Sequence, residues 1–120
     1  MKRMLIADGS DIVRKVGRKI LTELGFEVIE AASGREGLVK CERQLPDLMI
    51  VDAGMDDALD LISNVRALPD GKAVLIYYCV VEAELKIMMA GKRAGANDFL
   101  LKPFDRAILT KTFGDKAVAA

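Results

Sequence analysis

Five short, mostly apolar runs alternate along the chain with five segments of helical periodicity, and this alternation constrains the fold more than any other feature. The apolar runs cover residues 4–7, 27–31, 48–51, 73–78 and 98–101. Short runs that are apolar throughout are typical of parallel strands covered on both faces. Because helices connect successive parallel strands, the pattern predicts an α/β fold with a doubly wound, five-stranded parallel sheet and helices on both faces.

Signals at the helix ends divide the chain into the same units. Ser10 can cap a helix that continues to residue 24, and Gly25 is placed to end it. Ser33 and Glu36 form a capping box that opens a helix to about residue 43. Three further helices are expected over residues 58–68, 82–93 and 105–113, followed by a frayed tail over residues 114–120. We therefore expect a single domain over residues 1–120, with its core at about 3–113.

The composition excludes several kinds of chemistry. The chain has no histidine, which rules out Ser-His-Asp catalysis, histidine-containing metal sites and phosphohistidine. Its 18 basic and 18 acidic residues balance, unlike the basic excess of most nucleic-acid-binding domains. Cys41 and Cys79 lack CxxC spacing and are expected to be reduced thiols. With neither a signal peptide nor a membrane segment in the sequence, a cytoplasmic protein is expected.

The strand ends are the expected place for a functional site. In open parallel sheets the functional crevice lies outside the carboxyl ends of the strands, where the strand order switches. The residues that follow the predicted strands are Asp8 and Gly9, residues 52–57, residues 79–81 and Lys102. This set combines carboxylates with one lysine.

Three motifs at these strand ends resemble one known family. IADGSD follows the first strand, VDAGM the third, and AGANDFLLKPF surrounds the fifth. Together they resemble the response-regulator receiver (CheY-like) family, and the resemblance covers residues 3–113. It implies a flavodoxin-like (βα)5 fold with strand order 2-1-3-4-5. It also implies a cis peptide bond between Lys102 and Pro103, which the preferences of X-Pro bonds permit.

The resemblance also implies a chemistry, because receivers accept a phosphoryl group from a kinase phosphohistidine. Asp52 matches the phosphoacceptor, and Lys102 matches the lysine that pairs with the phosphoryl oxygens. Asp8, Asp52 and the backbone carbonyl of Gly54 match the Mg²⁺ ligands. A divalent cation is needed physically, because a carboxylate nucleophile must approach an anionic phosphorus.

Three departures from the family pattern bear on this chemistry. Gly9 replaces the second acid of the family's metal site, so we expect Mg²⁺ binding to be weak or absent. Val80 stands where the family has threonine or serine, and valine cannot hydrogen-bond to a phosphoryl oxygen. The loop after Asp52 lacks the family's proline and glycine. Its extra acids, Asp56 and Asp57, either add unfavourable charge or provide a substitute metal ligand.

Other residues are candidates for switching and for partner contacts. Phe99 matches the family's aromatic switch position, although it is equally suited to be a packed core residue. In the fourth predicted helix, Ile87 is expected to be exposed near Phe99, at the usual partner surface of receivers. The inward face of that helix is expected to comprise Leu85, Met88 and Met89.

The first predicted helix has two expected faces. Ile12 and Val16 belong to the apolar side, which is expected to be buried. A basic arc is expected in solvent, either as an ordinary solvated face or as a docking surface for a sensor histidine kinase or histidine phosphotransfer protein. A cyclic dinucleotide is a further candidate ligand for the arc. Its members are Arg14, Lys15, Arg18 and Lys19.

Two hypotheses for function follow. In the first, the chain is a stand-alone response regulator of a two-component phosphorelay that is phosphorylated on Asp52. Having no DNA-binding output domain, it would signal through a downstream protein partner. In the second, the chain is a degenerate receiver that binds a protein or nucleotide without phosphorylation. Neither hypothesis makes it an enzyme beyond self-catalysed phosphotransfer and dephosphorylation. The family resemblance favours the first, whereas Gly9 and Val80 favour the second.

Overall fold

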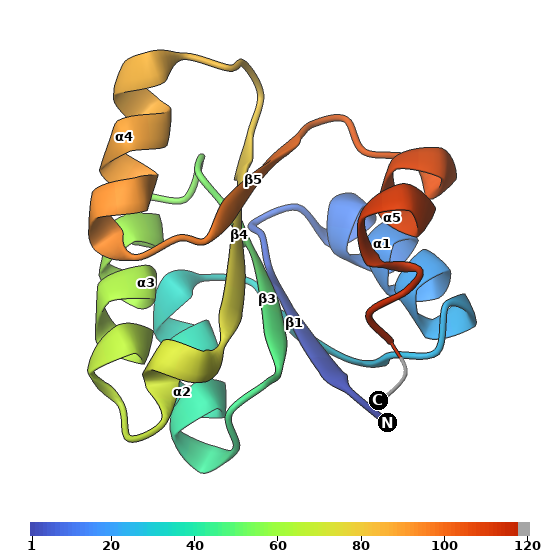
Figure 1. Cartoon of the computed structure of the whole chain (residues 1–120), viewed down its shortest axis with the longest axis horizontal. Helices are drawn as coiled ribbons and strands as arrows, with labels where there is room; N and C mark the ends of the chain where they lie inside the picture. The colour runs from blue at the N-terminus through green and yellow to red at the C-terminus, as the bar shows by residue number, and fades with distance from the viewer. Residues whose placement is uncertain (118–120) are drawn as a thin grey trace.

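A computed structural model describes residues 1–117 and shows a central five-stranded sheet (Figure 1). All strand pairings are parallel, and the strand order is β2-β1-β3-β4-β5. The predicted fold class and strand order are therefore confirmed. The strands are β1 (Arg3–Ala7), β2 (Glu27–Ala31), β3 (Leu48–Asp52), β4 (Leu75–Val80) and β5 (Asp98–Leu101).

The helices form a layer on each face of the sheet. One layer contains α2, α3 and α4, and the other contains α1 and α5 (Figure 1). The helices are α1 (Asp11–Glu23), α2 (Gly34–Arg43), α3 (Ala58–Ala67), α4 (Leu85–Ala94) and α5 (Arg106–Phe113), with a short 3₁₀ turn at Gly71–Ala73. The side chains of Ser10, Ser33 and Asp105 cap α1, α2 and α5, as predicted. Among the described helices, none combines the length and apolar character needed to cross a bilayer.

The structure extends β4 beyond its predicted end. Residues 73 and 74 precede the strand, and Cys79 and Val80 belong to it. Pairing with both neighbours explains the difference, because Cys79 pairs with Asp52 of β3 and Val80 with Leu101 of β5. Val80 is consequently the last strand residue, and α4 begins at Leu85 instead of residue 82.

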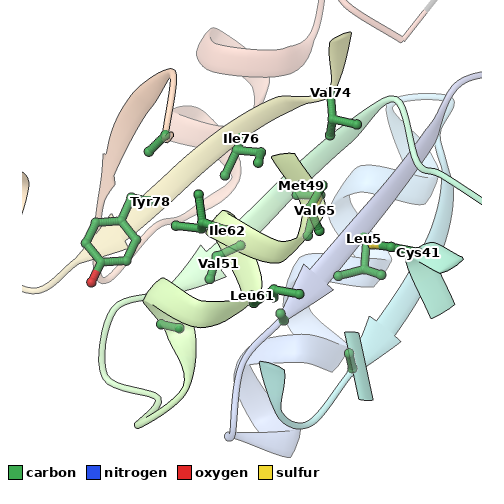
Figure 2. Close-up of a cluster of buried hydrophobic side chains, with 14 of the residues drawn as sticks. Leu5, Cys41, Met49, Val51, Leu61, Ile62, Val65, Val74, Ile76 and Tyr78 are labelled. Carbon is green, nitrogen blue, oxygen red and sulfur yellow. The ribbon is translucent and has the colours of Figure 1, made fainter. Parts of the chain in front are cut away.

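Two apolar layers fill the space between the sheet and its helices, because alternate strand residues face opposite sides. The layer under α2, α3 and α4 includes Leu5, Met49 and Val51 from the strands and Leu61, Ile62 and Val65 from α3 (Figure 2). The opposite layer includes Phe26, Tyr77 and Phe113, whose rings meet edge to face. Ala117 also packs into it and is 4% exposed. The frayed tail predicted from residue 114 is therefore wrong for residues 114–117, while residues 118–120 lie outside the described part of the chain.

The predicted inward face of α4 is only partly correct, because Met88 is the one member of it that is partly buried. Leu85 and Met89 are 72% and 47% exposed, so their predicted inward positions are wrong. The buried residue of the helix is Gly91, which faces the ring of Tyr78 from β4. A large residue on the strand thus requires a small residue on the helix, and this pairing rotates Leu85 and Met89 outward. Ile87 is exposed as predicted, at 38%.

We predict that Gly91→Ala will destabilise the protein by about 1–2 kcal/mol, the usual scale of overpacking. A Cβ atom at this position would lie 2.4 Å from Cδ2 of Tyr78, so the ring must move. In a Tyr78→Leu background the same substitution should instead be stabilising by up to about 1 kcal/mol, because alanine is the better helix former. Urea unfolding of the four proteins measures both effects. An equal effect of Gly91→Ala in the two backgrounds would contradict the proposed packing.

Candidate functional site

Three charged side chains converge at the carboxyl ends of β1, β3 and β5. Asp8 follows β1, Asp52 ends β3 and Lys102 follows β5. The ammonium nitrogen of Lys102 lies 2.6 Å from Oδ2 of Asp8 and 3.3 Å from Oδ1 of Asp52. Asp8, Asp52 and Lys102, which are far apart in the sequence, are therefore neighbours in the structure.

These residues line an open pocket of about 710 Å³. One wall is formed by the β1–α1 loop and by Ala32 and Ser33 at the start of α2, and the other by Gly54 and residues 55–57 of the β3–α3 loop. Gly9 lines the pocket and is exposed. The peptide bond between Lys102 and Pro103 is cis, as the family resemblance implied.

The backbone orients both carboxylates. Asp8 is 3% exposed, and its Oδ1 accepts a hydrogen bond of 2.8 Å from the N–H of Ser10. Oδ1 of Asp52 accepts one of 3.1 Å from the N–H of Gly54. Burial opposes the charge of Lys102, but the hydrogen bond to Asp8 and the charges of Asp52 and Asp8 outweigh it and raise the lysine's pKa. Lys102 therefore stays protonated at neutral pH.

The oxygen donors of the pocket suit a hard divalent cation, but with Gly9 the site has one carboxylate fewer than the family pattern. Two carboxylates and the carbonyl of Gly54 are oxygen donors, and Mg²⁺ is commonly held by one or two carboxylates together with water and phosphate oxygens. Among the described residues, no three Asp, Glu, Cys or His side chains are arranged to hold a metal ion. The backbone at Gly9 accepts a larger residue, because the nearest atom to an added Cβ is the carbonyl oxygen of Ala32 at 4.0 Å.

The two extra acids of the β3–α3 loop differ in their surroundings. Both oxygens of Asp57 accept hydrogen bonds from α2, at 2.9 Å from the N–H of Gly34 and 2.9 Å from that of Arg35. Asp56 is exposed and also lines the pocket. The role of Asp57 as a second cap on α2 was missed in the sequence, because its partners lie more than twenty residues away and local patterns do not show such pairs.

The predicted switch positions lie on neighbouring strands, Val80 at the end of β4 and Phe99 on β5. Val80 is 2% exposed and buried in the core. Phe99 is partly buried against the same layer and pairs with Tyr78 across β4 and β5. A groove of about 490 Å³ lies between α4 and the end of β4, and Val80 and Ile87 line it.

The predicted basic arc on α1 is wrong for Arg14. Its guanidinium donates to the carbonyl oxygen of Asp8 at 2.6 Å and to Glu30 at 3.2 Å, and it pairs with Asp11, so the residue is only 8% exposed. The carboxylate of Glu30 on β2 draws Arg14 inward. By contrast, Lys15, Arg18 and Lys19 are exposed, as expected.

The apolar side of α1 is also more exposed than predicted. Ile12 and Val16 are 77% and 48% exposed. They line a shallow pocket of about 340 Å³ together with Lys102, Pro103 and Phe104 of the β5–α5 loop. This apolar surface begins at the edge of the acidic pocket, since Lys102 lines both.

Comparison with known proteins identifies the family. A family model described as the response regulator receiver domain matches residues 4–113. The chain belongs to this family. The chemotaxis protein CheY of Thermotoga maritima is 30% identical over 106 residues, which cover 86% of this chain and 87% of that protein. The chain is thus a CheY-like receiver domain of two-component signalling.

Solved structures resemble this receiver domain closely. The chemotaxis protein CheY4 of Vibrio cholerae superimposes with a TM-score of 0.90 at 31% identity, covering 96% of this chain and 98% of that one. The receiver domain of the sensor histidine kinase PA1611 of Pseudomonas aeruginosa superimposes with a TM-score of 0.85 at 27% identity, covering 95% of each chain. The latter structure has a magnesium ion coordinated in its active site cleft.

We predict that Gly9→Asp will raise the affinity of the receiver domain for Mg²⁺ by roughly tenfold or more, because it adds a carboxylate to a site that has two. The substitution meets no steric obstacle in the present backbone. A Mg²⁺ titration followed by amide NMR shifts measures the affinity, with Gly9→Asn as a control of similar size without the charge. Saturation of wild type and Gly9→Asp at the same concentration would contradict the argument from carboxylate number.

Proposed function

We propose that this receiver domain is a response regulator that accepts a phosphoryl group on Asp52. The donor is a phosphohistidine of a sensor histidine kinase or of a histidine phosphotransfer protein. The observation that supports this assignment is the position of the Lys102 ammonium, which contacts both Asp8 and Asp52 and lines an open pocket. Such a group can pair with phosphoryl oxygens as they arrive beside the nucleophile.

In the transfer step, a carboxylate oxygen of Asp52 forms a bond to phosphorus while the bond from phosphorus to the donor's imidazole nitrogen breaks. The donor imidazole, protonated on its other ring nitrogen, takes the bonding electrons and leaves as neutral imidazole. Lys102 compensates negative charge on the phosphoryl oxygens, and Asp8 holds the lysine in place through their 2.6 Å contact. Asp8, Asp52 and the Gly54 carbonyl would hold Mg²⁺, which would supply further charge neutralisation. We propose that it binds weakly because Gly9 provides no ligand.

The surface around the pocket suits a protein donor. We propose that the donor docks on the apolar pocket formed by Ile12, Val16 and Phe104, which is continuous with the acidic pocket through Lys102. Lys15 and Lys19 follow Ile12 and Val16 by three residues on α1, are exposed, and favour an acidic partner. For output, we propose a downstream protein that contacts Ile87 and the Phe99 edge of the sheet. The proposed setting is the cytoplasm.

A second function is favoured by one specific observation. The response to phosphate requires a contact made only in the phosphorylated state. Val80 is buried at the end of β4 and has no hydroxyl to make such a contact. The alternative is therefore a receiver domain that binds its protein or nucleotide partner without phosphorylation, with the basic residues of α1 as the nucleotide-binding surface.

We predict that incubation with acetyl phosphate and Mg²⁺ will label Asp52. Phos-tag electrophoresis should show a slower band, and mass spectrometry should place the added phosphate on Asp52. Asp52→Asn should remove the band, whereas Asp56→Asn, which changes an exposed carboxylate in the same pocket, should retain it. The absence of label in wild type and in Gly9→Asp would refute the phosphoacceptor assignment and leave the binding module.

We predict that a phosphate mimic such as beryllofluoride will shift amide NMR signals mainly in the loops around Asp8, Asp52 and Lys102. In Val80→Thr the shifts should extend to α4 and Phe99, because the new hydroxyl gains a hydrogen bond to a charged group, worth roughly 1.5–3 kcal/mol. Val80→Ala serves as a control that changes the side chain without adding a donor. Large shifts across Ile87 and Phe99 in wild type would show that another contact couples the pocket to α4.

A further inference from the structure

Asp57 stands at the start of one helix but caps another. It is the N-cap residue of α3, and among the described residues its side chain makes no capping bond to that helix. Instead its carboxylate accepts hydrogen bonds of 2.9 Å from the N–H groups of both Gly34 and Arg35 in the first turn of α2. A carboxylate at a helix N-terminus gains from both the free N–H groups and the helix dipole.

The first turn of α2 is built to receive this carboxylate. Ser33, the residue expected to cap α2, accepts from the N–H of Glu36 at 3.1 Å, which leaves the two preceding N–H groups for Asp57. Gly34 is necessary for the approach. A Cβ atom there would lie 2.7 Å from Cγ, from Oδ1 and from the carbonyl oxygen of Asp57. The loop and the helix therefore fit together only with glycine at this position.

The contact joins the two walls of the acidic pocket. One wall includes Ala32 and Ser33 at the start of α2, and the other is the segment from Gly54 to Asp57. At its opposite end this segment is held by the N–H of Ala53, which donates to the carbonyl oxygen of Cys79 at 2.8 Å. Hydrogen bonds therefore hold both ends of the loop that follows Asp52, to β4 at Ala53 and to α2 at Asp57.

We propose that Asp57 is a positioning residue for the phosphoacceptor pocket. Its carboxylate, bound to the first turn of α2, holds residues 53–57 so that the Gly54 carbonyl and the Asp52 carboxylate lie at a fixed distance from Asp8. This assignment rests on the proposed function of the pocket. Each oxygen of Asp57 already accepts one backbone N–H, so the carboxylate is directed at α2.

The test compares Asp57→Ala with Asp56→Ala. Both variants remove one negative charge from the same loop and from the lining of the same pocket, but only Asp57→Ala removes the bonds to α2. We expect Asp57→Ala to speed hydrogen exchange at the amides of Gly34 and Arg35 and to lower the ¹⁵N order parameters of residues 53–56. Asp56→Ala should leave both unchanged. Asp57→Asn, which keeps one acceptor oxygen, should fall between them.

The second measurement is the affinity for Mg²⁺ in the folded proteins, from amide shifts. Removal of a supporting interaction around a metal site typically lowers affinity about 10–100-fold. We expect Asp57→Ala to bind Mg²⁺ about tenfold more weakly than Asp56→Ala. Because both variants lose one carboxylate from the same loop, this difference does not arise from the lost charge. Gly34→Ala keeps both acids but displaces the loop, and it should weaken binding in the same direction. Because a folded protein is required, each variant is first checked by its urea unfolding midpoint.

The outcomes separate this proposal from the proposed function. Equal loop order in Asp57→Ala and Asp56→Ala would overturn the positioning role, whatever the pocket binds. Equal Mg²⁺ affinity in these two variants, with wild type binding measurably, would also overturn it. If wild type neither binds Mg²⁺ nor is labelled on Asp52, the proposed function fails. The exchange and order measurements then still decide whether Asp57 holds the loop.

Discussion

The functional edge of this protein depends on one electrostatic arrangement, an ammonium group held between two carboxylates. Parallel pairing of β1 with β3 places Ala7 beside Val51, so the acids that follow in the chain, Asp8 and Asp52, come close together. Two adjacent carboxylates repel each other in a partly buried site. Lys102 offsets this repulsion through contacts of 2.6 and 3.3 Å. The position of Lys102 depends in turn on the pairing of β5 with β4, so the site requires the complete sheet.

In the proposed function, capture of a phosphoryl group and the response to it would use different parts of the molecule. Capture involves the charged groups at the ends of β1, β3 and β5, which are all in place. The response requires motion around Val80 and α4, where the contacts are apolar. There the ring of Tyr78 packs closely against Gly91, and this apolar contact positions α4 on the sheet. Among the described residues, the charged groups and α4 are thus connected through apolar side chains such as Val80.

The predictions that failed share a cause. A helical-wheel argument places charged residues of α1 in solvent, but Arg14 is buried because Glu30 of a neighbouring strand and the carbonyl of Asp8 provide partners for its guanidinium. The same argument places Leu85 and Met89 inward on α4, but Tyr78 on β4 leaves room only for Gly91. In both helices, a residue distant in sequence determined which face is buried. Local periodicity contains no information about such a neighbour.

The sequence by itself determined the fold class, the approximate helices and strands, and the strand ends where Asp8, Asp52 and Lys102 would be found. Those features follow from local interactions, because apolar runs, helix caps and turn residues act over a few positions. The strand order came instead from the resemblance to receivers. Tertiary structure decided the extension of β4 to Val80, the burial of Arg14 and the capping of α2 by Asp57. Each of these depends on a pairing or a contact between segments that only the folded chain brings together. The hydrogen bonds of Asp57 span more than twenty residues, and they exist because α2 and the β3–α3 loop lie on the same face of the sheet.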